Sequence, residues 1–287
     1  MNRMANDRSA LEIYPGLATS DGAGVRLTRY IGSPQLDHLD PFLLLDFFQS
    51  DNPDDYIAGF PSHPHRGFET VTYLLAGRVR HEDNAGHAGV IETGGIQWMS
   101  AGRGIVHSEM PEQEAGRLAG FQLWVNLPAA KKMAAPRYQE FSSSEIPVES
   151  RTQEVEIRVI AGHTSFGTQG PVRDVSTHPI YLDIALPPGQ SFCEPVPPDY
   201  AAFVFVIDGP LQICGRTAKE DMLTAARQLA TLGPGDRVHL VAENSPARCL
   251  LICGQPLKEP IARYGPFVMN TREEVLQAAH DFQSGKF

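Results

Sequence analysis

Short runs of strand-forming residues, separated by glycine and proline, fill this chain of 287 residues and limit what it can fold into. Val, Ile, Phe and Tyr dominate runs such as VTYLLAG (71–77) and AFVFVIDG (202–209), and each of these runs ends in a turn residue. Such runs between Gly and Pro turns are typical of a β-sandwich or a β-barrel. Long amphipathic stretches are scarce, so we expect an all-β fold of antiparallel strands.

One helix is expected at the end of the sequence. Thr271 and Glu274 fit a capping box, in which each side chain bonds the backbone amide of the other residue. Val275, Ala278 and Phe282 follow at helical spacing. We therefore predict a short helix with one packed face and a structural role.

The two halves of the chain resemble each other. TVTYLLAGRV (70–79) and GVIETGGIQW (89–98) are similar to AFVFVIDGPL (202–211) and LATLGPGDRV (229–238). This pattern suggests a duplicated β-barrel unit. The polar stretch FSSSEIPVES (141–150) fits a boundary. We predict two domains, residues 1–140 with the metal site and residues 141–287 without ligands, since the second half lacks a His-x-His pair and His239 is its lone histidine at a comparable place.

Charge and cysteine usage limit the classes of partner and compartment. The net charge is −10, and Lys and Arg are scattered, so we expect no direct nucleic-acid binding. No run approaches the roughly 18 apolar residues that a membrane span needs. The first 16 residues lack the apolar segment of a secretory signal.

The cysteines form no Cys-x-x-Cys pair, so we expect free thiols and a cytoplasmic protein, or a nuclear one in a eukaryote. They are Cys193, Cys214, Cys249 and Cys253.

Two pairs of metal-capable residues carry the candidate chemistry. In FPSHPHRGFETVTYLL (60–75), His63 and His65 are two residues apart, so in extended backbone both rings point the same way. Glu69 shares this parity if the strand runs unbroken through Gly67. A pair of this type also occurs by chance in many chains, so it is weak evidence alone.

A second pair, His107 and Glu109, follows the turn AGRG in WMSAGRGIVHSEMP (98–111). It can join His63 and His65 to form a set of three histidines and one carboxylate. Such a set suits Fe, Mn, Ni, Cu or Zn and leaves coordination positions open. Spacing alone leaves both Glu69 and Glu109 open as the carboxylate. We also expect Arg66 to pair with a carboxylate.

These motifs are similar to those of the pirin family in the cupin superfamily. The His-x-His pair, the Glu four residues on and Gly77 follow the first cupin motif, and Gly95 with GRGIVH (102–107) follows the second. Longer blocks carry the resemblance from about residue 21 to about residue 280. They are DGAGVRLTRYIGSPQLDHLDPFLLLDFF, HPHRGFETVTYLLAG, QWMSAGRGIVHSEMP, FQLWVNLP and YGPFVMNT.

The resemblance implies a bicupin, with two antiparallel jelly-roll barrels, a short C-terminal helix and one metal in the N-terminal barrel. It assigns the metal ligands to His63, His65, His107 and Glu109. Glu69 is then left for a supporting role behind the ligands or a structural one. The implied metal is Fe(II), with Mn, Ni, Cu, Co or Zn as alternatives.

The resemblance also implies an activity, because some pirin-like proteins resemble quercetin 2,3-dioxygenases. The substrates would be a flavonol-like aromatic compound and O₂, with Glu109 as the base. The alternative is an iron-binding, redox-sensitive regulator that binds a transcription factor or a metabolic enzyme, which the acidic charge also suits. A metal-dependent isomerase or hydrolase is a third hypothesis. We expect a monomer.

Overall fold

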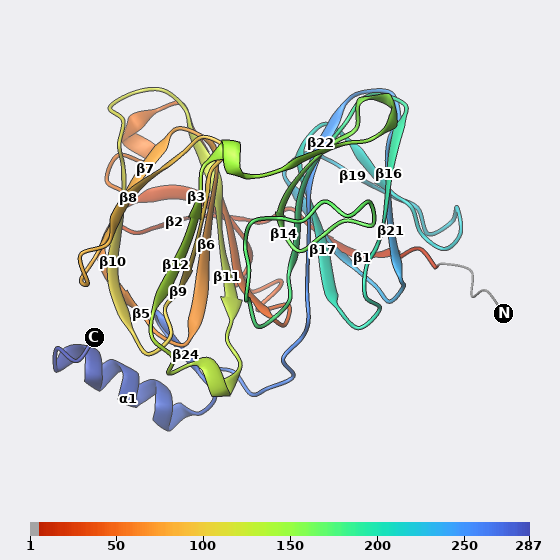
Figure 1. Ribbon diagram of the computed structural model, residues 1–287. Helices are drawn as coiled ribbons and strands as arrows, with labels where there is room; N and C mark the ends of the chain where they lie inside the picture. Colours follow the sequence, from red (N-terminus) through yellow and green to blue (C-terminus); the bar gives the residue numbers. More distant parts are fainter. Residues whose placement is uncertain (1–5) are drawn as a thin grey trace. The chain divides into compact units, whose positions relative to one another are not determined.

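The computed structural model describes residues 6–287, and nearly all of its regular structure is β-strand (Figure 1). The all-β prediction is confirmed. The chain divides into two compact units, here named the first barrel and the second barrel. Within residues 6–287 no helix has the length and apolar character needed to cross a membrane. Four short 3₁₀ helices connect strands: η1 (Pro53–Asp55), η2 (Ala129–Lys131), η3 (Ser143–Glu145) and η4 (Thr152–Glu154).

The first barrel comprises Leu17–Glu145 and Leu257–Phe287, and all of its strand pairs are antiparallel. Its large sheet has the order β12 (Arg137–Phe141), β9 (Ile96–Ser100), β6 (Phe68–Ala76), β11 (Leu118–Asn126), β4 (Phe42–Ser50), β3 (Val25–Ile31), β2 (Leu17–Asp21). Its small sheet has the order β5 (Phe60–His65), β10 (Ile105–Pro111), β7 (Arg78–Asp83), β8 (Ala88–Glu92). A hairpin of β23 (Ala262–Tyr264) and β24 (Phe267–Met269) forms a third sheet.

The second barrel comprises Ile146–Pro256 and the described part of Met1–Gly16. Its large sheet has the order β1 (Ala10–Tyr14), β20 (Gln228–Leu232), β17 (Ala201–Asp208), β22 (Ala247–Gly254), β15 (Ile180–Leu186), β14 (Glu156–Ala161), β13 (Val148–Ser150). Its small sheet has the order β16 (Gln190–Pro195), β21 (Arg237–Ala242), β18 (Leu211–Ile213), β19 (Met222–Thr224). The two large sheets have equivalent strand orders, since β9, β6 and β11 in the first barrel correspond to β20, β17 and β22 in the second. The repeat seen in the sequence is therefore a repeat of topology.

The two barrels do not follow a single division at residue 140, because each end of the described chain belongs to the barrel formed mostly by the other half. β1 pairs with β20, which places the start of the described chain in the second barrel. Residues 257–287 belong to the first barrel, where the backbone of Phe267 pairs with that of Arg66. These pairings join residues far apart in sequence, and a change in local composition does not reveal them. Residues 1–5 of the predicted first domain lie outside the described residues.

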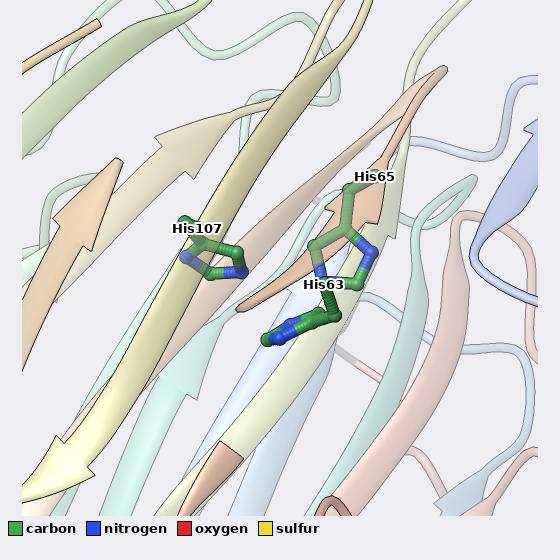
Figure 2. A group of neighbouring side chains, drawn as sticks. All are labelled: His63, His65 and His107. Carbon is green, nitrogen blue, oxygen red and sulfur yellow. The ribbon is translucent and has the colours of Figure 1, made fainter. Parts of the chain in front are cut away.

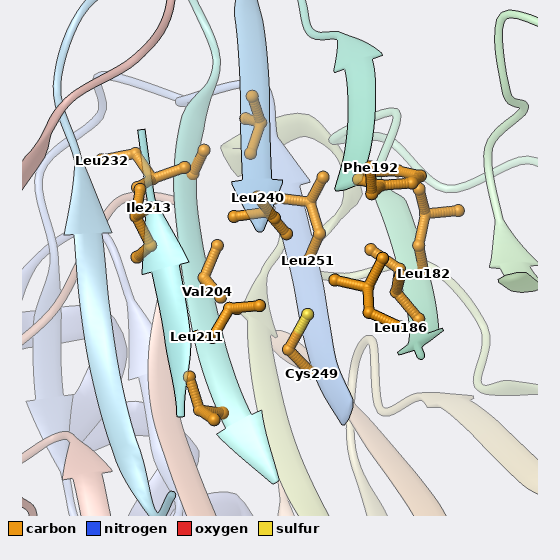
Figure 3. Packing of buried hydrophobic residues seen from close by; sticks show 14 of the residues in the cluster. Leu182, Leu186, Phe192, Val204, Leu211, Ile213, Leu232, Leu240, Cys249 and Leu251 are labelled. Carbon is orange, nitrogen blue, oxygen red and sulfur yellow. The ribbon is translucent and has the colours of Figure 1, made fainter. Parts of the chain in front are cut away.

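The second barrel has an apolar interior (Figure 3). On its small sheet, Leu240 lies opposite Phe192, and both side chains are almost fully buried. Cys249 and Cys253 are buried in the same cluster, which confirms that they are packing residues. All four cysteines are free thiols. His239 lies on the partly exposed face of β21, with its Nδ1 3.7 Å from Asp7.

The C-terminal helix α1 (Arg272–Gln283) packs on β23 and β24 in the first barrel (Figure 1). Thr271 caps it, and the predicted capping box with Glu274 is present. The buried Arg66, next to His65 in the chain, donates a hydrogen bond to Asp281 of this helix at 2.9 Å. The expected pairing of Arg66 with a carboxylate is confirmed, and it ties the helix to the end of β5.

A buried lysine joins three segments behind the same turn. Lys132 Nζ donates to the carbonyl oxygens of Gly67 at 2.8 Å and Val268 at 3.1 Å, and to Asn126 Oδ1 at 2.6 Å. Gly67 has φ +90°, and a Cβ there would lie 1.9 Å from the Val268 oxygen. Only glycine fits this turn, since both the backbone conformation and the space exclude a side chain.

Replacing Lys132 by Met is expected to lower the free energy of unfolding by about 2 kcal/mol or more, because three buried acceptors lose their donor. Urea unfolding measures the change, with Lys131→Met on the exposed neighbouring residue as the control. Equal effects of the two substitutions would contradict the role given to Lys132.

Candidate metal centre

Three histidines meet inside the first barrel, with their rings turned toward one another (Figure 2). β5 supplies His63 and His65, and β10 supplies His107 directly opposite His63. The centroid of the His63 ring lies 4.7 Å from that of the His65 ring and 4.5 Å from that of the His107 ring. One nitrogen of each ring lies within 4.8 Å of those of the other two, so the group can hold one metal ion. The alternation predicted from the His-x-His spacing produces this convergence.

The hydrogen bonding of the rings fits a bound cation. His63 Nδ1 lies 2.8 Å from the Pro61 carbonyl oxygen, so it carries the proton and leaves Nε2 with a free lone pair. Both ring nitrogens of His107, and Nδ1 of His65, are buried without a hydrogen-bond partner among residues 6–287. Leaving buried polar atoms unpaired costs free energy. A metal ion would remove that cost at the nitrogens that face it.

Burial keeps the imidazoles in the form that binds metals. The pKa of His107 is lowered to about 4, chiefly by desolvation, while Glu109 acts to raise it and His63 adds to the lowering. Desolvation also holds the pKa of His65 well below its usual value, with added repulsion from His107 and His63. Both rings are therefore neutral at neutral pH, and neutral imidazole is the ligand form.

Glu109 lies beside the histidines in the same cavity, but it is not part of the close group of ligand atoms. It follows His107 by two residues on β10 and is buried. Thr72 donates its hydroxyl to Oε1 of Glu109 at 2.8 Å, and the side-chain amide of Gln122 donates to Oε2 at 3.3 Å. These two bonds orient the carboxylate. Its assignment as a metal ligand stays a prediction.

Glu69 points to the other face of β6. β5 ends at His65 and β6 begins at Phe68, so the strand does not run unbroken through Gly67. The Phe68 ring contacts His65 at 5.1 Å, and Thr72, on the same face of β6, contacts Glu109. Alternation then directs Glu69 away from the histidines. Its side chain is buried, and its Oε2 has no hydrogen-bond partner within the described chain.

His63 and His65 open onto a cavity of about 590 Å³ whose walls are mostly apolar. Leu27, Phe48 and Phe60 form part of the walls. Trp124 of β11 adds its ring at 5.3 Å from that of His65. Four further residues line the cavity without a role predicted from the sequence: Thr72, Gln122, Trp124 and Arg263. Gln122 and Trp124 had a usable signal, because they alternate within FQLWVNL and so share one face of a strand.

Family models match both barrels of the chain. The pirin model matches residues 24–125, and the model of the pirin C-terminal cupin domain matches residues 181–287. The chain belongs to the pirin family. This confirms the resemblance found in the sequence and the bicupin fold that it implies.

Relatives and solved structures agree with this membership over nearly the full chain. A pirin-like protein of Caulobacter vibrioides is 54% identical, over 98% of this chain and 99% of that protein. A pirin-like protein of Solanum lycopersicum is 46% identical, over 94% of this chain and 89% of that protein. A crystal structure of quercetin 2,3-dioxygenase from Acinetobacter baumannii is 34% identical, with a TM-score of 0.88 and 98% of each chain covered.

Replacing both His63 and His107 by Ala should abolish metal binding by this pirin. The purified wild-type protein should carry about one metal ion per chain by elemental analysis, as a single site requires. A matched double variant, His87→Ala with His178→Ala, alters two exposed histidines outside the group and should keep its metal. Metal retained after loss of His63 and His107 would show that the site lies elsewhere.

Replacing Glu69 by Gln should stabilise the metal-free protein above pH 7. Burial raises the pKa of Glu69 from 4.5 to about 7. The folded state therefore keeps a proton that the unfolded chain loses, so the free energy of unfolding falls as the pH rises from about 4.5 to about 7. The substitution removes this loss, so it should raise the free energy of unfolding at pH 8 by up to about 3 kcal/mol.

Urea unfolding at pH 4.5 and pH 8 tests this expectation. Glu92→Gln, on an exposed residue, is the control and should change stability little at either pH. A gain from Glu69→Gln that is equal at both pH values would mean that ionisation of Glu69 is not its source.

Proposed function

We propose that this pirin is a metal-dependent dioxygenase that opens the central ring of a flavonol such as quercetin with O₂. The observation that carries the proposal is a group of three converging imidazoles, two of them buried with unpaired ring nitrogens, beside a mostly apolar cavity that also contains a carboxylate. Similarity to the quercetin 2,3-dioxygenase of Acinetobacter baumannii supports the same reaction. In that reaction both atoms of O₂ enter the ring-opened product, and the carbon between the attacked positions leaves as carbon monoxide.

His63, His65 and His107 would hold the metal, with Glu109 as the predicted fourth ligand. The donor set of imidazole and carboxylate suits Fe(II), and it also admits Mn, Ni, Cu, Co or Zn. A bound Fe(II) would supply Lewis acidity toward the flavonol oxygens and redox capacity toward O₂. The chain's own contribution is to place the substrate, exclude water and move one proton.

The residues around the cavity can perform these three tasks. The aromatic and aliphatic walls, with Phe48, Phe60 and Trp124 among them, suit a planar aromatic ring and displace water from it. Glu109 would take the proton of the flavonol 3-hydroxyl group. Its hydrogen bonds from Thr72 and Gln122 hold the carboxylate in one orientation, which general-base catalysis requires.

The direct test is reconstitution with Fe(II) without oxygen, followed by quercetin and then air. The flavonol absorbance should disappear, with one carbon monoxide released for each O₂ consumed. Failure with Fe, Mn, Ni, Cu and Co alike would overturn the dioxygenase proposal.

Replacing Glu109 by Gln should lower kcat about 100-fold or more if the carboxylate acts as a base. Elemental analysis should still find metal in this variant, because the three histidines remain. Glu112→Gln makes the same change outside the cavity and should leave kcat unaltered. An unchanged kcat in a Glu109→Gln variant that keeps its metal would contradict the assignment as a base.

A further inference from the structure

We propose that Arg263 is an anion-binding residue of the metal cavity, and that the substrates are planar aromatic compounds with an anionic oxygen that Arg263 binds. A carboxylate or a phenolate would supply that oxygen. Arg263 lines the same cavity as His63, His65 and Glu109. The proposal names the substrate class of the proposed dioxygenase and in that sense rests on it, although the binding it describes does not need the metal.

The hairpin of β23 and β24 places the Arg263 guanidinium at this cavity. Phe267 in β24 pairs with Arg66, directly after His65, so the hairpin is attached to the strand that carries two of the histidines. The guanidinium carbon of Arg263 lies 4.8 Å from the centre of the Trp124 ring. Stacking on an aromatic face is favourable for arginine, and it leaves the N–H groups free to donate in the plane of the guanidinium group.

Arg263 forms no ion pair and donates no hydrogen bond to the protein among residues 6–287. Asp37, Asp46 and Asp21 attract its charge without reaching ion-pair distance, and Arg29 repels it. Arg263 is thus a cavity cation with its donors unused. An arginine held in this way matches an anionic oxygen, because its donors form a fixed fork.

The three carboxylates that line the cavity already have other donors. Arg29 binds Asp46 through two hydrogen bonds of 2.8 and 2.7 Å, and it also donates to Asp21 at 2.7 Å. Glu109 is held by the hydroxyl and amide groups described above. Arg263 is therefore the lining cation that a ligand can still neutralise.

The cavity then has two recognition points near the Trp124 ring. The centre of the His65 ring lies 5.3 Å from the centre of this ring, and the guanidinium carbon of Arg263 lies 4.8 Å from it. A volume of about 590 Å³ falls in the range of small-molecule sites. A planar ligand can present one oxygen to the metal site and a second, charged oxygen to Arg263.

Calorimetric titration of metal-free protein at pH 8 tests the inference, with matched anionic and neutral ligands. The first arm compares 2-naphthoate with 2-naphthamide, and the second compares 4-nitrophenolate with 4-nitroanisole. Wild-type protein should bind the anion at least about 10-fold more tightly in one or both arms, as expected for a charge-assisted hydrogen bond. Arg263→Gln should abolish the preference, and Arg263→Lys should keep part of it because the charge remains without the fork.

Arg80→Gln is the matched control, since it removes an exposed arginine of β7 that does not line the cavity. It should leave the preference unchanged, and equal thermal midpoints should establish that all variants fold. No preference in the wild type, or the full preference in Arg263→Gln, overturns the role of Arg263. Neither result depends on quercetin turnover, so the anion site and the dioxygenase proposal can fail separately.

Discussion

The turn at Gly67 determines where the side chains of the candidate metal centre point. Its φ of +90° and the close approach of the Val268 carbonyl end β5 and allow β6 to begin on a new alternation. His65 before the turn and Phe68 after it consequently face the same interior, while Glu69 faces away. Lys132 holds the turn from behind through the Gly67 carbonyl, and its three acceptors offset the cost of burying an ammonium group.

The two barrels show how little a fold determines about chemistry. They share strand order, yet equivalent small sheets carry His63 opposite His107 in one and Phe192 opposite Leu240 in the other. In the second barrel these positions complete an apolar core, which stabilises the unit by burying hydrocarbon. In the first, the same framework buries His65 and His107 with ring nitrogens that lack hydrogen-bond partners within the described chain. Function therefore depends on the side chains placed within the fold.

Much of the site can be predicted from the sequence because its histidines lie in two short motifs on extended backbone. Alternation is a local property, so the convergence of His63, His65 and His107 followed from spacing and strand composition. Glu69 shows the limit of that reasoning, since one turn residue reversed its direction. Arg263 lay beyond it altogether, because its segment reaches the cavity only through pairing of β24 beside Arg66. The exchange of terminal segments is hidden from local patterns for the same reason.

The bond between Arg66 and Asp281 bears on how this protein can be divided. It joins the residue that follows His65 to a helix encoded at the far end of the chain. A contiguous fragment ending at residue 145 would keep all three histidines but lose this anchor and the hairpin that carries Arg263. The smallest self-contained piece is thus discontinuous in the gene. Making it as one polypeptide would require residues 257–287 to be fused to residues 17–145 through a linker, in place of the intervening barrel.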